Sequence, residues 1–159
     1  MCIRDRGRPG KIHKVDIDTS YFNGNQPSKV SLYACYIKNK LPNKNSKWIN
    51  ILKKKSTKPN SHHFFNIKNK SIFTHVKLNI YPDGGVARIR IYGEMKINKK
   101  FGKKITNLTS VLNGATPIAC NNEHFGRAEN ILAPGMGKNM GDGWETKRSR
   151  GKNLSLIHI

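Results

Sequence analysis

The stretch that decides the fold is "THVKLNIYPDGGVARIRIYG", residues 74–93, in which two alternating segments flank a turn. Successive side chains of a strand point to opposite faces, so alternation of apolar and polar residues indicates a half-buried strand. The Asp-Gly of "PDGG" at 82–85 tolerates positive φ and is typical of a tight turn. The sequence therefore predicts strands at 74–81 and 86–93, joined as a hairpin at 82–85. The aliphatic residues on their predicted inner faces are Val76, Leu78 and Ile80, then Ala87, Ile89 and Ile91.

Shorter runs before this stretch also alternate apolar and polar residues. We expect strands in "KIHKVDID" (11–18), "KVSLYACYI" (29–37) and "HHFFNI" (62–67). The lysine-rich residues 38–60 are predicted to be a connection that contains one short strand, "WINIL" (48–52). Many short strands separated by turns predict an all-β fold, an antiparallel jelly-roll sandwich.

The alternation of apolar and polar residues stops after the strand predicted at 86–93. "EMKINKKFGKK" is charged and unpatterned, and we expect a linker at 98–108. From residue 109 onward Gly and polar turn residues dominate, and the segment 109–153 is too short to bury a core alone. The chain is therefore expected to hold a sandwich at 7–97 and a second, shorter piece at 109–153.

Both ends look foreign to the rest of the chain. "MCIRDR" (1–6) and "LSLIHI" (154–159) can be encoded by one short DNA read in opposite orientations, as a sequencing-library adapter would be. We therefore interpret both ends as adapter-derived and set them outside the fold argument. On this interpretation the chain is an internal fragment of a longer protein.

The chain is strongly basic, with 30 Lys and Arg against 9 Asp and Glu and a net charge of +21. Such a balance suggests nucleic acid or an anionic surface as partner. The lysines, however, are scattered among Asn and Ile, the residues that AT-rich codons favour, and no arginine-rich helix or aromatic RNA-binding signature is present. We therefore expect no nucleic-acid partner. An apolar run of about eighteen residues and a signal-peptide core are both missing, which predicts no membrane partner and a cytoplasmic location.

Two pairs of residues stand out as candidates for chemistry in the first unit. Asp16 and Asp18 are two apart, hence on one strand face, where they either bind a cation or accept amides of the following turn. His62 and His63 are consecutive, so a strand directs them to opposite faces and at most one serves a given site. An imidazole is suited to proton transfer near neutral pH.

Two arginines follow the predicted turn. Arg88 and Arg90 share a strand face beside Asp83, and this fork either suits a carboxylate ligand or is a pair of solvated strand cations. Near the end of the chain, "NMGDGWETKRSR" (139–150) combines acidic residues, basic residues and Trp144, which we interpret as an anchor in the hydrophobic core. Its acids either orient Arg148 or act on a substrate.

Four blocks of the chain together resemble the allantoicase family, the allantoate amidinohydrolases built from two tandem repeats. "NIYPDGGVAR" and "NMGDGWET" are the most specific parts of the resemblance. It implies that 7–97 is the later part of a first repeat and 109–153 the beginning of a second, each repeat being a galactose-binding-like jelly roll. The four blocks are residues 10–32, 61–65, 74–94 and 113–150.

The resemblance implies that the parent protein hydrolyses allantoate to ureidoglycolate and urea, in allantoin and purine degradation. Such a cleavage requires an acid to protonate departing urea, a base to activate water and a cation to hold the substrate carboxylate. The family also implies a homo-oligomeric full-length protein; no cofactor is assured, and a divalent metal ion is left as an option. We expect the fragment itself to be inactive, because much of each repeat is absent.

The resemblance gives candidates for these roles by residue type within the matching blocks, with Arg88 holding the substrate carboxylate. The alternative is a non-catalytic β-sandwich that binds a ligand or carbohydrate. The expected catalytic residues are His62, His63, Asp18, Asp83, Glu123 and Glu145, and the expected substrate-binding residues are Arg88, Asn79, Tyr81 and Arg148.

Because the two repeats are related, 109–153 is a candidate to dock on 7–97 in place of the missing beginning of the first repeat. This arrangement predicts contact between Trp144 and the core strands at 30–36 or 76–91. Cys35 and Cys120 are isolated from any CxxC pattern, and we expect free thiols without a role as metal ligands.

Overall fold

The computed structural model describes most of the chain, namely residues 9–38, 41–96, 105–120 and 122–148. The ends interpreted as adapter-derived, 1–6 and 154–159, lie outside these residues, as does most of the predicted linker. Within the described ranges no helix is long and apolar enough to cross a bilayer.

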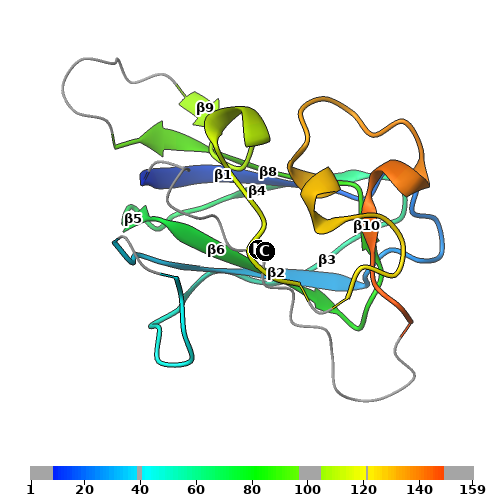
Figure 1. Ribbon diagram of the computed structural model, residues 1–159, viewed down its shortest axis with the longest axis horizontal. Helices are drawn as coiled ribbons and strands as arrows, with labels where there is room; N and C mark the ends of the chain where they lie inside the picture. Colours follow the sequence, from blue (N-terminus) through cyan, green and yellow to red (C-terminus); the bar gives the residue numbers. More distant parts are fainter. Residues whose placement is uncertain (1–8, 39–40, 97–104, 121, 149–159) are drawn as a thin grey trace.

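Two antiparallel sheets face each other and form a sandwich (Figure 1). The all-β, antiparallel prediction is confirmed, while the jelly-roll order of the complete repeat stays a prediction. The first sheet has the order β4–β1–β8–β9, made of β4 (His62–Asn66), β1 (Gly10–Asp18), β8 (Arg88–Met95) and β9 (Ile105–Asn107), with β5 (Ile72–Phe73) also on β1. The second sheet has the order β3–β2–β6, made of β3 (Ile49–Ser56), β2 (Lys29–Cys35) and β6 (His75–Tyr81).

The core lies between the sheets, where the alternating aliphatic residues of the central strands meet. All of these side chains are buried, and removal of their apolar surface from water is the main favourable contribution to folding. The inner faces are formed by Val15 and Ile17 of β1, Ile89 and Ile91 of β8, Val30 and Leu32 of β2, and Leu78 and Ile80 of β6.

The predicted hairpin at 82–85 is wrong. β6 pairs with β2 in the second sheet, whereas β8 pairs with β1 in the first, so residues 82–87 cross from one sheet to the other. This crossover contains β7 (Gly85–Val86), and a Cβ on Gly85 would overlap the buried ring of Phe22. The glycine therefore serves a close approach between chain segments, as well as a turn.

Two segments expected to be connections are partly built into the sheets. The strand predicted at 48–52 extends to Ser56 and carries the lysines at 53–55 along the free edge of the second sheet. Residues 105–107 of the predicted linker form β9, which pairs with β8. Backbone pairing therefore continues into sequence that has no apolar alternation.

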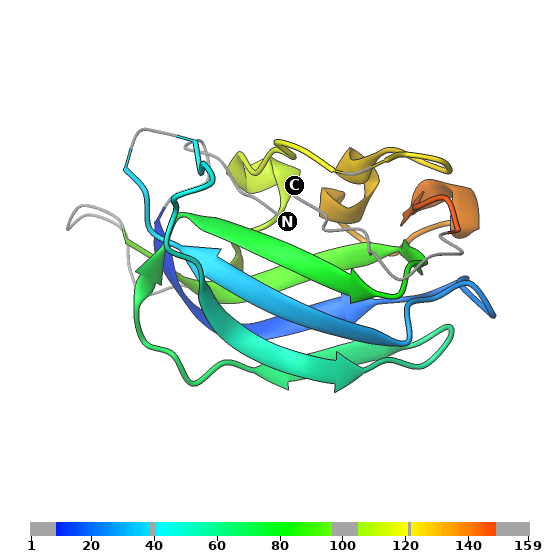
Figure 2. The same ribbon diagram turned by 90° about the horizontal axis from the view of Figure 1, so that it is seen from below.

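Residues 109–148 run along one open side of the sandwich, seen as the yellow-to-orange segment in Figure 2. Trp144 pairs with Val86 through β10 (Trp144–Glu145) and β7, so the predicted contact between Trp144 and the strands at 76–91 is present. Ile131 and Leu132 are buried in the same core cluster. One hydrophobic core therefore serves both parts of the chain. The segment also contains three short 3-10 helices, η1 (Val111–Asn113), η2 (Ala128–Leu132) and η3 (Met140–Asp142).

Candidate active site

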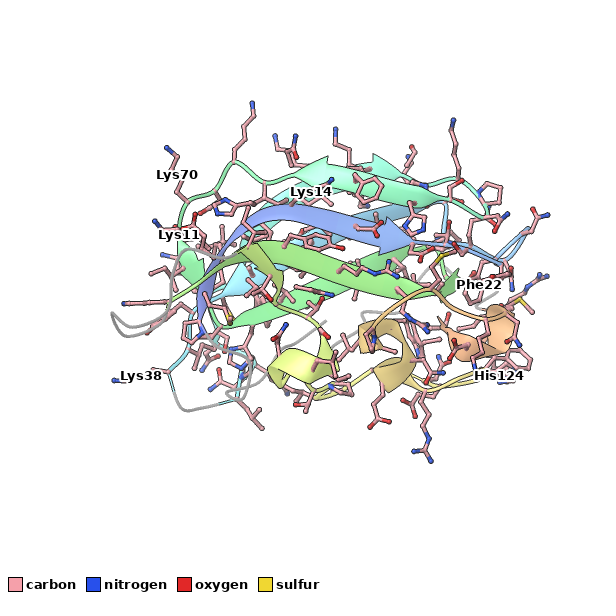
Figure 3. All side chains as sticks on the ribbon, turned by 90° about the horizontal axis from the view of Figure 1, so that it is seen from above. Lys11, Lys14, Phe22, Lys38, Lys70 and His124 are labelled. Atoms are coloured by element: carbon pink, nitrogen blue, oxygen red, sulfur yellow. The ribbon has the colours of Figure 1, made fainter. Side chains whose placement is uncertain are left out.

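An open cavity of roughly 760 Å³ lies at the end of the sandwich marked by Phe22 and His124 in Figure 3. Its volume is in the range of small-molecule sites, about 300–1,000 Å³. One lining residue, Asn25, comes from the loop after β1, and the others come from the segment 109–148. The lining residues are Asn25, His124, Phe125, Met140, Gly141, Glu145, Thr146, Lys147 and Arg148.

Glu145 is the buried acid of this cavity, with 7% of its surface exposed. Its Oε1 accepts a hydrogen bond of 2.9 Å from Asn25 Nδ2, which joins β10 to the loop after β1. Lys147 and Arg148 line the same cavity and are exposed. A ligand that carries both N–H donors and a carboxylate therefore finds complementary groups within one space.

The backbone around Glu145 is held from both sides. Its Cα partner in β7 is Gly85, and on the other side its backbone exchanges hydrogen bonds of 2.7 and 3.1 Å with Phe125. Asn130 Nδ2 donates to the carbonyl of Gly143, two residues earlier, at 2.9 Å. The carboxylate thus stands on a short strand fixed by its neighbours, although most of the surrounding segment is irregular.

Arg88 lies beneath the cavity wall, on the outer face of β8. It is 2% exposed, and its guanidinium donates to the Asp142 carbonyl and, at 2.9 Å, to Asp142 Oδ2. The backbone N–H of Lys138 donates to the same carboxylate oxygen at 3.0 Å. These interactions, first the Lys138 hydrogen bond and then those from Arg88, hold the pKa of Asp142 below its usual value.

A second polar group is centred on Arg90, also on the outer face of β8. Arg90 Nη1 lies 2.9 Å from Asp16 Oδ2 and 3.3 Å from Asp18 Oδ2, and Nη2 donates to the Gly135 carbonyl. His62 reaches this group from β4, with Nδ1 3.0 Å from Asp16 and Nε2 3.6 Å from Asp18. Asp18 Oδ1 also accepts the Ser20 amide, as one sequence-based alternative expected.

The structure distributes the ten predicted site residues over several places. Glu145 and Arg148 line the cavity, whereas Asp18 and His62 belong to the Arg90 group and Arg88 is covered by Asp142. His63 engages backbone instead, because its Nδ1 lies 2.9 Å from the Ile17 carbonyl and its Nε2 accepts from Lys58 N–H. The catalytic and binding roles predicted for all of these residues stay predictions.

The remaining candidates lie elsewhere. Asn79 and Tyr81 project from the outer face of β6, in the second sheet, where the Tyr81 hydroxyl contacts Ser31 Oγ at 3.0 Å. Glu123 accepts the Ala128 amide at the start of η2, and Asp83 lies half-buried in the crossover. The structure therefore does not bring the ten residues together into a single constellation.

Only Glu145 and Arg148 of the cavity residues were expected from sequence; among the others, Asn25, His124 and Lys147 carry nitrogen-containing side chains. Asn25 occurs in a turn-rich stretch, where an Asn is ordinarily explained by turn chemistry. His124 lies in a segment without periodicity, which gives no indication of its neighbours. Among the described residues, no group of three or more His, Cys, Asp or Glu side chains is arranged to hold a metal ion.

Comparisons with known proteins agree with this architecture. The allantoicase repeat model matches residues 1–96 and 106–159. The probable allantoicase of Photobacterium profundum is 48% identical over 152 residues, which cover 94% of this chain and 46% of that protein. The probable allantoicase of Acinetobacter baylyi is 47% identical over 149 residues, which cover 94% and 44%. The chain thus spans less than half the length of these curated relatives.

Two solved structures are similar as well. A structure of allantoicase aligns at a TM-score of 0.53 and 39% identity, over 91% of this chain and 45% of that one. The crystal structure of allantoicase from Saccharomyces cerevisiae aligns at 0.51 and 39%, over 91% and 46%. The chain belongs to the allantoicase family.

Proposed function

We propose that the complete protein, of which this chain is a part, hydrolyses allantoate to ureidoglycolate and urea. Family membership supports the reaction. The proposed location of the active site rests on one observation, which is that the buried Glu145 shares a cavity with the exposed cations Lys147 and Arg148. Allantoate carries one carboxylate and two ureido groups, and these match the cations and the acid respectively.

In this proposal Arg148 and Lys147 hold the substrate carboxylate through charge-assisted hydrogen bonds. Glu145, kept in place by Asn25, accepts ureido N–H groups or removes a proton from water. His124 lines the same cavity, and we assign to it the donation of the proton that departing urea requires. Water adds its hydroxyl to the central carbon, the bond from that carbon to one ureido nitrogen breaks, and the nitrogen takes the proton.

Because the chain spans less than half the length of its curated relatives, we propose that the chain alone does not turn over allantoate. A cytoplasmic homo-oligomer remains the proposed state of the complete protein. No resident cofactor is proposed, and activity after treatment with a chelator tests the divalent-metal option.

Urea release from allantoate by the complete protein tests the proposed function. We expect release with the native sequence and a large loss with Glu145→Gln, which keeps the shape of the side chain and removes its charge. The contrasting function is a ligand-binding sandwich, for which the exposed ring of Phe125 beside the cavity is the relevant observation. Glycan binding without urea release would replace the hydrolase proposal with that one.

A further inference from the structure

We propose that Arg88 and Arg90 are positioning residues that hold the loop 133–142 against the first sheet and thereby set one wall of the cavity. We call this arrangement the loop clamp, consisting of the two arginines and their loop partners Gly135 and Asp142. The clamp follows from contacts within the chain, and only its effect on allantoate rests on the proposed function.

The two arginines occupy alternate positions of β8 and therefore project from the same face. Arg88 is 2% exposed and Arg90 is 9% exposed, so both charges require partners within the fold. Each donates to a backbone carbonyl of the loop, Arg90 to Gly135 and Arg88 to Asp142. The Gly135 carbonyl lies in irregular chain and the Asp142 carbonyl lies at the end of η3, and the guanidinium groups supply hydrogen-bond donors to both.

Asp142 connects the clamp to the cavity. Its carboxylate accepts from both Arg88 and the Lys138 amide, and its backbone N–H lies 3.2 Å from the Asn139 side-chain oxygen. Gly141, the preceding residue, lines the cavity. A displacement of Asp142 from Arg88 would therefore move the wall itself.

Tyr21 borders the same loop from another side. Its φ of 68° lies in the left-handed region, which is unfavourable for a bulky residue, and its N–H donates to Asn60 Oδ1 at 2.9 Å. A Cβ on Gly137 would lie 3.7 Å from Arg88 Nη1 and 3.8 Å from Tyr21 Cε2. Gly137 thus sits between the clamp and a residue whose own conformation is imposed by its surroundings.

Neither arginine lines the cavity. Arg88 therefore acts on a bound ligand through the loop, whereas a residue that holds the substrate carboxylate has to reach the cavity with its own guanidinium. The distinction matters because these two roles predict different results for a conservative replacement by lysine. Lysine keeps the positive charge but cannot donate to Asp142 through two nitrogens.

Hydrogen–deuterium exchange of this 159-residue chain tests the clamp without any ligand. With Arg88→Ala we expect the amides at 133–146 to exchange about tenfold faster or more, because hydrogen bonds to a charged group are lost. Arg88→Lys should restore part of the protection. The control is Arg127→Ala, which removes an exposed ion pair with Glu129 (3.9 Å) from the same segment and should change nothing. If Arg88→Ala does not fold, Asp142→Asn provides the same comparison with the arginine retained.

Unchanged exchange in Arg88→Ala, or an equal increase in Arg127→Ala, would overturn the clamp. In a complete family member that releases urea, the positioning role predicts that Arg88→Ala raises KM for allantoate more than it lowers kcat. A loss confined to kcat contradicts positioning and assigns Arg88 to the chemistry. If the complete protein releases no urea at all, the proposed function is wrong. The hydrogen–deuterium exchange result still tests the clamp, because it does not depend on activity.

Discussion

Trp144 and Val86 are antiparallel partners in the β10–β7 pair, and both side chains are completely buried. The indole N–H donates to the Asn122 carbonyl at 3.1 Å, so the tryptophan is fixed by its backbone, its ring and its polar atom. This pair joins the segment 109–148 to the crossover between the two sheets. Residues from both sides of the predicted linker therefore complete one core in this chain.

Replacement of Trp144 by Ala should lower the free energy of unfolding by about 3–5 kcal/mol, because it leaves a large cavity at the junction. Urea denaturation followed by circular dichroism measures the change. Trp48→Ala is the matched control, since Trp48 is only half-buried and lies outside this junction. A Trp144→Ala variant as stable as the native chain would show that the junction contributes nothing to folding.

Glu145→Gln should lower kcat/KM for allantoate in the complete protein by roughly 100-fold, the scale of a lost general acid or base. Steady-state urea release is the measurement. Glu129→Gln, at an exposed acid of the same segment, is the control and should retain full activity. Equal activities of the Glu145 variant and the native protein would exclude this carboxylate from catalysis.

Asp142 should give the chain an acid-dependent stability. Its pKa is lowered in the folded state from the ordinary value of 3.8, chiefly by the Lys138 amide and further by Arg88, so unfolded chains bind the proton more readily. The contribution is therefore complete above the ordinary pKa and is lost as the pH falls through the lowered one. Asp142→Asn should be less stable near neutral pH and lose less stability on acidification. Urea midpoints from about pH 6 to about pH 2 test this, and parallel curves for both proteins would contradict it.

Cys120 should react slowly with alkylating reagents. Burial, together with the nearby Glu123 carboxylate, raises the pKa of its thiol from 9.0 to about 11. The reactive thiolate is correspondingly scarce at pH 8, and we expect alkylation roughly 100-fold slower than for a thiol of ordinary pKa. Mass spectrometry of the Cys120 peptide measures the rate against a short cysteine peptide. Glu123→Gln should accelerate the reaction modestly, because burial is the larger cause, and native Cys120 reacting as fast as the peptide would refute the shift.

Local sequence predicted the strands well but not the partners of all of them. The alternation in β6 and β8 is visible because each strand buries one face against the same core. The turn chemistry of 82–85 constrains only nearby dihedral angles, so it is compatible with a hairpin and with a crossover. The pairing of β6 with β2 and of β8 with β1 depends on contacts between residues distant in sequence, and these decided the arrangement.

The sequence indicated which kinds of residue belong to the candidate site better than it indicated which residues lie close together. Glu145 and Arg148 stand out in a dense polar motif, and the cavity contains both. Asn25 joins them only because the loop after β1 folds back to the segment 109–148. The hydrogen bond between Arg88 and Asp142 could not be predicted either. Asp142 belongs to a segment without periodicity, and no strand pattern in the sequence places that segment next to β8.

The lysines of β3 have a consequence for the behaviour of the protein at high concentration. Among the residues that the structure describes, β3 has no partner on its outer side, and its residues Lys53, Lys54 and Lys55 are all exposed. An open edge offers unpaired backbone groups that can recruit the same strand from another molecule and begin aggregation. Two such edges repel each other here, since each presents three positive charges. We therefore expect this run, which resembles a by-product of codon usage, to keep neighbouring molecules from extending one another's sheets.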